Sequence, residues 1–263
     1  MSLDQLLMLP PGYGFDNAAT VSLPTPLGRW KFDIGSVFQT NGGSAAVTGD
    51  PIGQAVDSGS LLQDGTQTTT ARPLVSATVP TPLAGANARS ASFDGTNDWL
   101  DCTNNSSLKL VGPGSFSAWF QLSAYSGSAV YTIGERGYNG TGLNFSMSID
   151  NGVLWFISYA GVAVYGAKSA KTWSAADIGV WYHVVGVYTN TPGYSWKLYF
   201  DGADVSVTQG SLTAPYNSDR KFTIGCEDAN GIPTRFFPGL IDDVRFYDQA
   251  LTPQQVAAIY AGG

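Results

Sequence analysis

Apolar and polar residues alternate along most of the chain after residue 89. In the clearest run, 115–122, Phe116, Ala118, Phe120 and Leu122 share one face, because successive side chains of a strand point to opposite sides. About a dozen such short runs at even spacing are typical of an antiparallel sandwich. We expect strands at 29–34, 90–93, 97–102, 115–122, 130–134, 143–149, 153–159, 181–188, 194–200, 205–208, 221–226 and 240–247.

Local signals add two hairpins and one helix to this pattern. Residues 150–152 (DNG) and 201–202 (DG) favour tight turns, because Asn, Asp and Gly tolerate positive φ angles. Thr252 is a good helix N-cap, and Pro253 and Gln255 complete the start signal. An apolar stripe at helical spacing then predicts one short C-terminal helix covering the sandwich near its last strand: Val256, Ile259 and Tyr260.

The first part of the chain is less regular. Residues 1–27 hold four prolines and show no core periodicity, so we expect an extended N-terminal arm before a single sandwich domain at 28–263. The arm is either a flexible tail or an anchor docked on a partner through Leu3, Leu6 and Leu7. Residues 39–82 are rich in Gly, Ser and Thr, which predicts long connections with one or two short strands.

The last strand, 240–247, carries two adjacent carboxylates, Asp242 and Asp243, in an apolar run. A strand so late in the chain pairs with much earlier strands, so the fold closes here. Its period of two puts the carboxylates on opposite faces, and we expect at most one to be buried. A buried carboxylate needs a hydrogen-bonding partner or a metal.

Composition narrows the class of partner. The 263 residues are 43% hydrophobic and 13% aromatic, which indicates a packed core. Charged residues are only 13%, about half the usual share, and the net charge is −7. The absence of basic runs makes nucleic acid and anionic membranes poor partners. A surface of Ser, Thr, Asn and Gly suits close protein packing or contact with sugars.

The N-terminal residues predict a product made in the cytosol. The leucine-rich start contains Asp4 and no basic region, so it does not predict a secretory signal. No segment reaches the roughly 18 apolar residues of a membrane span. Cys102 and Cys226 form either one bridge or two buried thiols.

Five motifs in order resemble those of laminin-G-like, concanavalin A-like jelly-roll domains. They are 92–100 (SFDGTNDWL), 115–120 (SFSAWF), 181–188 (WYHVVGVY), 198–202 (LYFDG) and 239–247 (GLIDDVRFY). Residues 45–75 also resemble the lead-in of some phage and bacterial members. The resemblance implies an all-β jelly-roll sandwich. It is a weak guide to the ligand, because the family includes lectins, adhesion modules, sugar-binding appendages and virion proteins.

The resemblance also implies a structural calcium ion. In similar jelly rolls an aspartate of the closing strand holds the ion together with loop carbonyls, which here implicates Asp242 with the turn at Asp94 and Gly95. Hard cations prefer such oxygen ligands. The alternative is that Asp242 accepts hydrogen bonds from backbone N–H groups of that turn without a metal.

Catalysis is poorly supported. Glycoside hydrolysis needs two carboxylates flanking the scissile bond, yet Glu135 and Glu227 are the only glutamates and neither has an acidic residue two positions later. We expect Glu135 in a turn ion pair and Glu227 in a solvated loop. His183, the only histidine, fits a structural strand position better than a zinc site or a triad. The chain is therefore not expected to be an enzyme.

Sugar binding would use exposed aromatic and amide side chains in or beside glycine-rich loops. The candidates are Tyr138, Asn139, Tyr159, Trp173 and Tyr216. The arm and the phage-type lead-in favour a phage virion accessory protein at the virion surface, a capsid decoration or fibre component, with virion proteins, cell-surface glycans or further copies of the chain as partners. The alternative is a carbohydrate-binding or adhesion lectin module, extracellular or at a cell surface.

Overall fold

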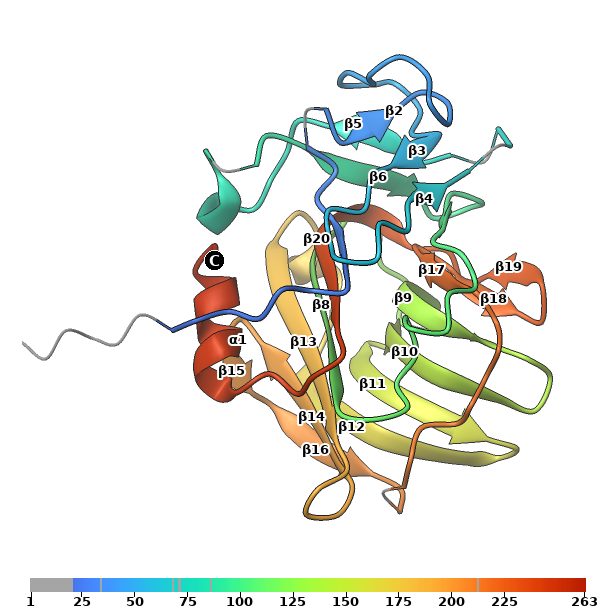
Figure 1. The fold of residues 1–263 in the computed structure, drawn as a ribbon, viewed down its shortest axis with the longest axis vertical. Helices are drawn as coiled ribbons and strands as arrows, with labels where there is room; N and C mark the ends of the chain where they lie inside the picture. The colour runs from blue at the N-terminus through green and yellow to red at the C-terminus, as the bar shows by residue number, and fades with distance from the viewer. Residues whose placement is uncertain (1–20, 34, 68, 71, 86, 212) are drawn as a thin grey trace, which may run out of the picture.

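Two sheets pack face to face in the computed structural model (Figure 1). The structure describes residues 21–33, 35–67, 69–70, 72–85, 87–211 and 213–263. Sheet A is eight-stranded, and its β1 (Gly28–Trp30) pairs with β20. The other strands of sheet A lie in the order β15 (Ala203–Asp204), β14 (Ser195–Phe200), β13 (Trp181–Thr189), β8 (Gly114–Leu122), β20 (Pro238–Tyr247), β6 (Ser90–Asp94) and β5 (Leu74–Ser76).

Sheet B is twelve-stranded and carries a short hairpin, β18 (Glu227–Ala229) with β19 (Ile232–Thr234), which joins β9. Its main path runs β16 (Ser206–Gln209), β12 (Ala163–Thr172), β11 (Val153–Ala160), β10 (Gly142–Asp150), β9 (Val130–Tyr138), β17 (Phe222–Ile224), β7 (Leu100–Asp101), β4 (Gly65–Thr66), β3 (Gln54–Ala55) and β2 (Val37–Phe38). Short 3-10 turns occupy Thr81–Leu83 and Ala175–Asp177.

The inner faces of the two sheets form one aromatic core, which confirms the predicted antiparallel sandwich. Phe116 of β8 lies 5.7 Å from Phe145 of β10, measured between ring centroids, and Phe145 lies 5.7 Å from Phe246 of β20. All three rings are buried. Each buried ring of this kind contributes roughly 1.5–3 kcal/mol to folding, so the alternating pattern of 115–122 accounts for the packing of β8.

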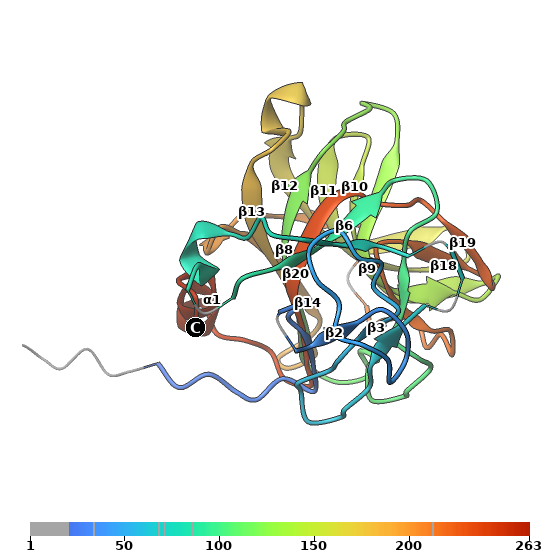
Figure 2. The ribbon, with the colours of Figure 1, turned by 90° about the horizontal axis from the view of Figure 1, so that it is seen from above.

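The predicted C-terminal helix is confirmed as α1 (Pro253–Tyr260). Thr252 caps it, since its hydroxyl accepts from the Gln255 N–H at 3.2 Å. Val256 and Ile259 are buried against Tyr247 at the end of β20. The helix therefore covers the outer face of sheet A, and Figure 2 shows it on the opposite side of the molecule from the β18–β19 hairpin.

Three segments differ from the sequence prediction. Strands β3, β4 and β5 fall in the region 39–82, where one or two strands were expected. Strand β12 was missed because residues 163–172 mix Gly, Ala, Ser and Lys with little alternation. The hairpin β18–β19 was also missed, and its Glu227 is a buried strand residue instead of a solvated loop residue.

The expectation for the closing strand was wrong, because both carboxylates are buried. A β-bulge shifts the register between Asp242 and Arg245, and Asp243 adopts φ 42°. This extra residue breaks the period of two. Asp243 can therefore bind Arg29 and Arg245 while Asp242 is enclosed beside it.

Residues 21–27 of the predicted arm lie against the sandwich. The Leu27 N–H donates to the Phe246 carbonyl at 2.8 Å, and Gln255 Nε2 donates to the Ser22 carbonyl at 3.1 Å. The anchor residues Leu3, Leu6 and Leu7 lie outside the described residues. The two cysteines are free buried thiols, so the unbridged alternative holds.

Candidate functional site

Two partly exposed tyrosines form a pair on sheet B. Tyr138 at the end of β9 and Tyr159 near the end of β11 both lie opposite Leu143 of the intervening strand, and their ring centroids are 5.4 Å apart. Asn139 follows directly, and its side-chain oxygen accepts from the backbone N–H groups of Thr141 and Gly142, each at 3.2 Å. The structure thus brings together three of the five predicted sugar-binding residues.

The tyrosine pair continues a row of apolar side chains along β11. Trp155, Ile157 and Tyr159 are partly exposed, and they alternate with the core residues Leu154 and Phe156. They therefore lie on the outer face of sheet B, turned away from sheet A. The neighbouring strand supplies a cation, since the ammonium group of Lys168 lies 5.1 Å from the centre of the Trp155 ring. An aromatic platform with adjacent polar groups is the result.

The only two glutamates of the chain converge beside this platform. Glu135 lies in the middle of β9, opposite Ser146, whose hydroxyl hydrogen-bonds to it. Burial, and then the nearby Glu227 carboxylate, raise the pKa of Glu135 well above its usual range. Burial also raises the pKa of Glu227, although Arg235 forms an ion pair with it. Sequence reasoning missed this pair, because no local signal places residues so far apart in the chain side by side.

The negative charges of Glu135 and Glu227 also affect the pKa of Tyr159. Burial, followed by the negative charge of Glu227, raises the pKa of the Tyr159 hydroxyl to about 12. The hydroxyl is therefore a neutral hydrogen-bond donor at all physiological pH values. Together with the amide of Asn139, it supplies polar groups at the rim of an aromatic surface, which is the composition of small-ligand sites.

The β18–β19 hairpin forms a fixed wall next to the cluster. Asp228 of β18 receives two hydrogen bonds from Arg220, Nε to Oδ2 and Nη2 to Oδ1, both at 2.9 Å. Its Oδ1 also accepts from the Gly231 N–H at the hairpin turn at 2.6 Å. A bidentate Arg–carboxylate pair fixes geometry as well as charge, so the hairpin holds Glu227 in place.

The other two predicted sugar-binding residues lie elsewhere. Trp173 is only 1% exposed and packs edge-on against Phe200 at 5.4 Å, so its expected exposure was wrong. Its glycine- and serine-containing surroundings suggested a loop, but β12 and the turn at 175–177 bury it. Tyr216 is partly exposed and packs against Gly142, where an added Cβ would meet its ring at 2.6 Å.

The predicted calcium ligands do not form one coordination sphere. Asp94 pairs with Pro238, four residues before Asp242 along β20, which separates the two by about 13 Å. Asp94 caps its own turn by accepting from the N–H groups of Thr96 and Asn97. Asp242 accepts from Asn87 Nδ2 and from the Asp243 N–H, each at 2.7 Å, and not from the turn.

Gly95 packs against Pro238 instead of facing Asp242. In the part of the chain that the structure describes, no group of three or more His, Cys, Asp or Glu residues is placed to hold a metal. The donor set around Asp242 therefore does not fit a calcium ion among the described residues, and calcium binding itself stays a prediction.

His183 has the structural position expected from its strand. It is buried, and its Nε2 lies 3.0 Å from the Ser117 hydroxyl.

No helix among the described residues is long and apolar enough to cross a membrane.

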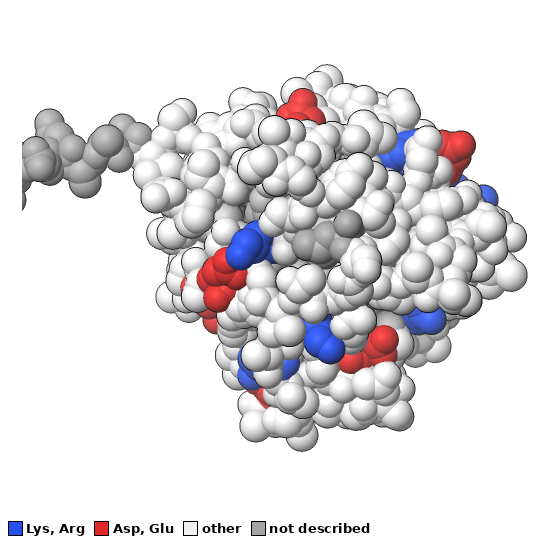
Figure 3. All heavy atoms as spheres, turned by 90° about the horizontal axis from the view of Figure 1, so that it is seen from below, with Lys and Arg blue, Asp and Glu red and all other residues white. Residues whose placement is uncertain are grey.

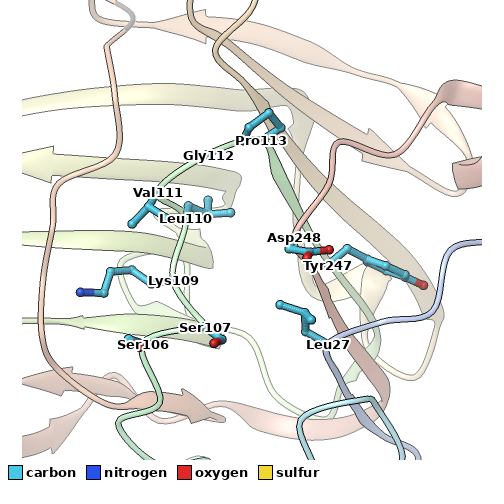
Figure 4. A pocket seen from close by; sticks show the side chains of 10 residues that line it. All are labelled: Leu27, Ser106, Ser107, Lys109, Leu110, Val111, Gly112, Pro113, Tyr247 and Asp248. Atoms are coloured by element: carbon cyan, nitrogen blue, oxygen red, sulfur yellow. The ribbon is translucent and has the colours of Figure 1, made fainter.

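A cleft of about 320 Å³ lies between residues 106–113 and the end of β20 (Figure 4). It offers few free functional groups. Lys109 and Tyr247 point away from its centre in opposite directions, and the Lys109 ammonium is already bound by Asn217 at 2.8 Å and Asp219 at 2.7 Å. On the face drawn in Figure 3, lysines and arginines lie beside acidic residues instead of forming a patch of one sign. The outer face of sheet B is thus the best candidate site.

The protein is a β-sandwich that carries an aromatic and polar platform on the outer face of one sheet. A model of the concanavalin A-like lectin/glucanases superfamily, Laminin_G_3, matches residues 94–257, which is more than half of the chain. The chain therefore belongs to this superfamily. No curated protein sequence matches it.

Solved structures share the fold at low identity. Domain 4 of AbnA, a GH43 extracellular arabinanase from Geobacillus stearothermophilus in complex with arabinotriose, is 18% identical with a TM-score of 0.55, and the match covers 91% of this chain and all of that domain. The receptor-binding domain of botulinum neurotoxin type G is 12% identical with a TM-score of 0.53, covering 90% of this chain and 51% of that one. A mutant Trypanosoma rangeli sialidase with trans-sialidase activity is 13% identical with a TM-score of 0.57, covering 92% of this chain and 34% of that one.

Proposed function

We propose that this protein is a non-enzymatic carbohydrate-binding module whose sugar site lies on the outer face of sheet B, at Tyr138 and Tyr159. The observation that carries the proposal is the pair of partly exposed rings 5.4 Å apart. Aromatic faces pack against the C–H faces of sugar rings, and the neighbouring Asn139 and Tyr159 polar groups can bind sugar hydroxyls.

The arabinanase domain, solved in complex with arabinotriose, supports a sugar ligand for this fold. The low surface charge supports neutral glycans over anionic polymers. Such a module would meet its ligand outside a cell or at a cell surface. The similar solved structures favour a carbohydrate-binding module over a virion accessory protein. The virion role stays a prediction that depends on Leu3, Leu6 and Leu7.

Replacing Tyr159 by alanine should weaken glycan binding roughly tenfold or more, since truncating a central aromatic contact costs about 1–2 kcal/mol or more. Ligands would first be found on a glycan array and affinities then measured by calorimetry. Tyr194→Ala is the matched control, because Tyr194 is 46% exposed in the loop between β13 and β14 of sheet A. Equal affinities of wild type, Tyr138→Ala and Tyr159→Ala for every glycan bound would overturn the site.

The bound glycan should leave the protein uncleaved. Hydrolysis needs two carboxylates that reach the scissile bond, but Glu135 is 1% exposed and Glu227 is held by Arg235. Incubating the protein with a bound oligosaccharide and measuring new reducing ends tests this expectation. Release of reducing ends by wild type that disappears in Glu135→Gln would show that the chain is an enzyme.

A further inference from the structure

A second aromatic site lies on the same face of sheet B, on the far side of the β18–β19 hairpin. Trp99, just before β7, is partly exposed and lines a cavity of about 360 Å³, together with Thr66, Gln67, Thr69, Asp101 and Lys221. This volume falls in the range of small-ligand sites, roughly 300–1,000 Å³. Trp99 also lines a smaller cavity, next to Arg220 and Asp228.

Strand pairing sets the position of this cavity. Thr66 of β4 pairs with Asp101 of β7, which pairs with Thr223 of β17, and Thr223 pairs with Glu135 of β9. Directly paired residues share a face of the sheet, so the cavity opens on the same outer face as Tyr159. Four strand spacings, about 19 Å, separate β7 from β11 along the sheet order (Figure 1). Trp99 and Tyr159 are therefore too far apart to contact one sugar ring.

The cavity is lined by groups that suit a neutral sugar. The Lys221 ammonium lies 5.8 Å from the Trp99 ring centre and forms an ion pair with Asp101. Arg220, at the smaller cavity, is likewise paired with Asp228. Every charge at the site thus has its counter-charge within the protein, so an anionic ligand would have to displace a carboxylate. Hydroxyl groups can instead share these polar atoms while a ring packs on the indole.

The opposite wall comes from the segment before the superfamily match. The Gln67 side-chain oxygen accepts from the Thr69 backbone N–H at 3.2 Å and from its hydroxyl at 3.1 Å, which ties these two lining residues together. Thr66, Gln67 and Thr69 precede residue 94, where the match begins. The cavity is therefore built partly from residues that the superfamily model does not describe.

We propose that the Trp99 cavity is a second carbohydrate-binding site, specific for a neutral sugar and independent of the tyrosine pair. The proposal rests on the proposed function, but it uses a different set of residues. A chain with two sites on one face can bind two branches or two neighbouring strands of a glycan surface, which multiplies its apparent affinity for a dense array without new contacts.

Three variants test the second site on an array of neutral and acidic glycans: Trp99→Ala, Tyr159→Ala and the double variant. Trp99→Ala should lose roughly tenfold or more in affinity for one set of neutral glycans while keeping the set that depends on Tyr159. Tyr159→Ala should show the converse, and the double variant should bind neither set. Trp181→Ala in sheet A, also partly exposed, is the matched control for loss of an indole, and thermal unfolding verifies that each variant folds.

The outcomes separate the two proposals. If Tyr159→Ala abolishes all binding and Trp99→Ala, folded as wild type, changes none, the second site is wrong and the proposed function stands. If neither variant changes any binding, both proposed sites are wrong, and if wild type binds no glycan the proposed function fails. If Trp99→Ala weakens only acidic glycans, the site exists with another ligand class and the assignment to neutral sugars is overturned.

Discussion

Replacing Asp243 by asparagine is expected to lower the free energy of unfolding by roughly 3–5 kcal/mol, the cost of removing one partner from a buried ion pair. Asp243 receives a hydrogen bond from Arg29 Nε at 2.7 Å and another from Arg245 Nε at 3.0 Å. Arg245 is 2% exposed and would remain charged and buried. Asparagine keeps the side-chain shape and tolerates the positive φ at this position, so the loss would report the missing charge and not the bulge.

The pKa of Asp243 gives this prediction a second readout. Burial opposes ionisation of Asp243, but Arg245 and then Arg29 outweigh it and lower the pKa below 3.8. A carboxylate with a lowered pKa stabilises the fold above its unfolded pKa, and this contribution is lost as the pH falls through the folded value. The difference between wild type and Asp243→Asn should therefore be full at pH 7 and shrink below about pH 4.

Urea unfolding at pH 7 and pH 3 measures both effects. Asp248→Asn is the matched control, because Asp248 is exposed one residue past β20, and a surface change of this kind stays within about 0.5 kcal/mol. A loss below about 1 kcal/mol in Asp243→Asn at pH 7 would contradict the central place given to the Arg29–Asp243–Arg245 cluster.

This cluster also shows where sequence reasoning stops. The alternation rule located β20 and its role in closing the fold, since 238–247 pairs with β1, β6 and β8. It failed at one residue, because a bulge leaves no mark in the local pattern when the bulged residue is not glycine. Arg29 and Arg245 could not be assigned to Asp243 from the sequence, since contact over this separation depends on the whole topology.

Some residues of the candidate site also have local sequence signals, and others do not. Tyr138, Asn139 and Tyr159 could be proposed from the sequence, because turn residues and aromatics are local signals of an exposed rim. Glu135, Glu227 and Trp99 could not, because their neighbours come from sheet pairings of distant strands. Trp173 was wrongly predicted to be exposed. A tryptophan beside small residues looks like a loop residue until the preceding strand, β12, is known.

Lowering the pH should destabilise the fold through His183, by about 1.4 kcal/mol per pH unit between pH 6 and pH 4. Burial, and then the positive charge of Arg245, lower the pKa of His183 from 6.5 to about 3, although Asp243 acts in the opposite direction. The folded state thus holds a neutral imidazole where the unfolded chain binds a proton. The stability that the neutral ring contributes is complete above pH 6.5 and is lost as the pH falls toward 3.

The surroundings of His183 explain why protonation costs so much. Its ring lies 5.0 Å from the Trp119 ring and 6.0 Å from the Tyr260 ring, both measured between centroids. The ring nitrogen Nδ1 is buried with no hydrogen-bond partner among the described residues. A second N–H on the ring would therefore point into an apolar layer with no acceptor, while Arg245 repels the new charge.

Comparing wild type with His183→Asn isolates this effect from the carboxyl groups that titrate in the same range. Burial raises the pKa of Asp98 to about 6 and that of Asp242 well above its usual range, so both groups stabilise the fold as the pH falls, but they do so in both proteins. The difference in unfolding free energy should shrink by roughly 2–3 kcal/mol from pH 6 to pH 4. Ser117→Ala removes the Nε2 partner but keeps a titrating ring, so it should retain the wild-type slope. Parallel stability curves for wild type and His183→Asn would contradict this account. They would mean that the folded protein protonates His183 as readily as the unfolded chain does.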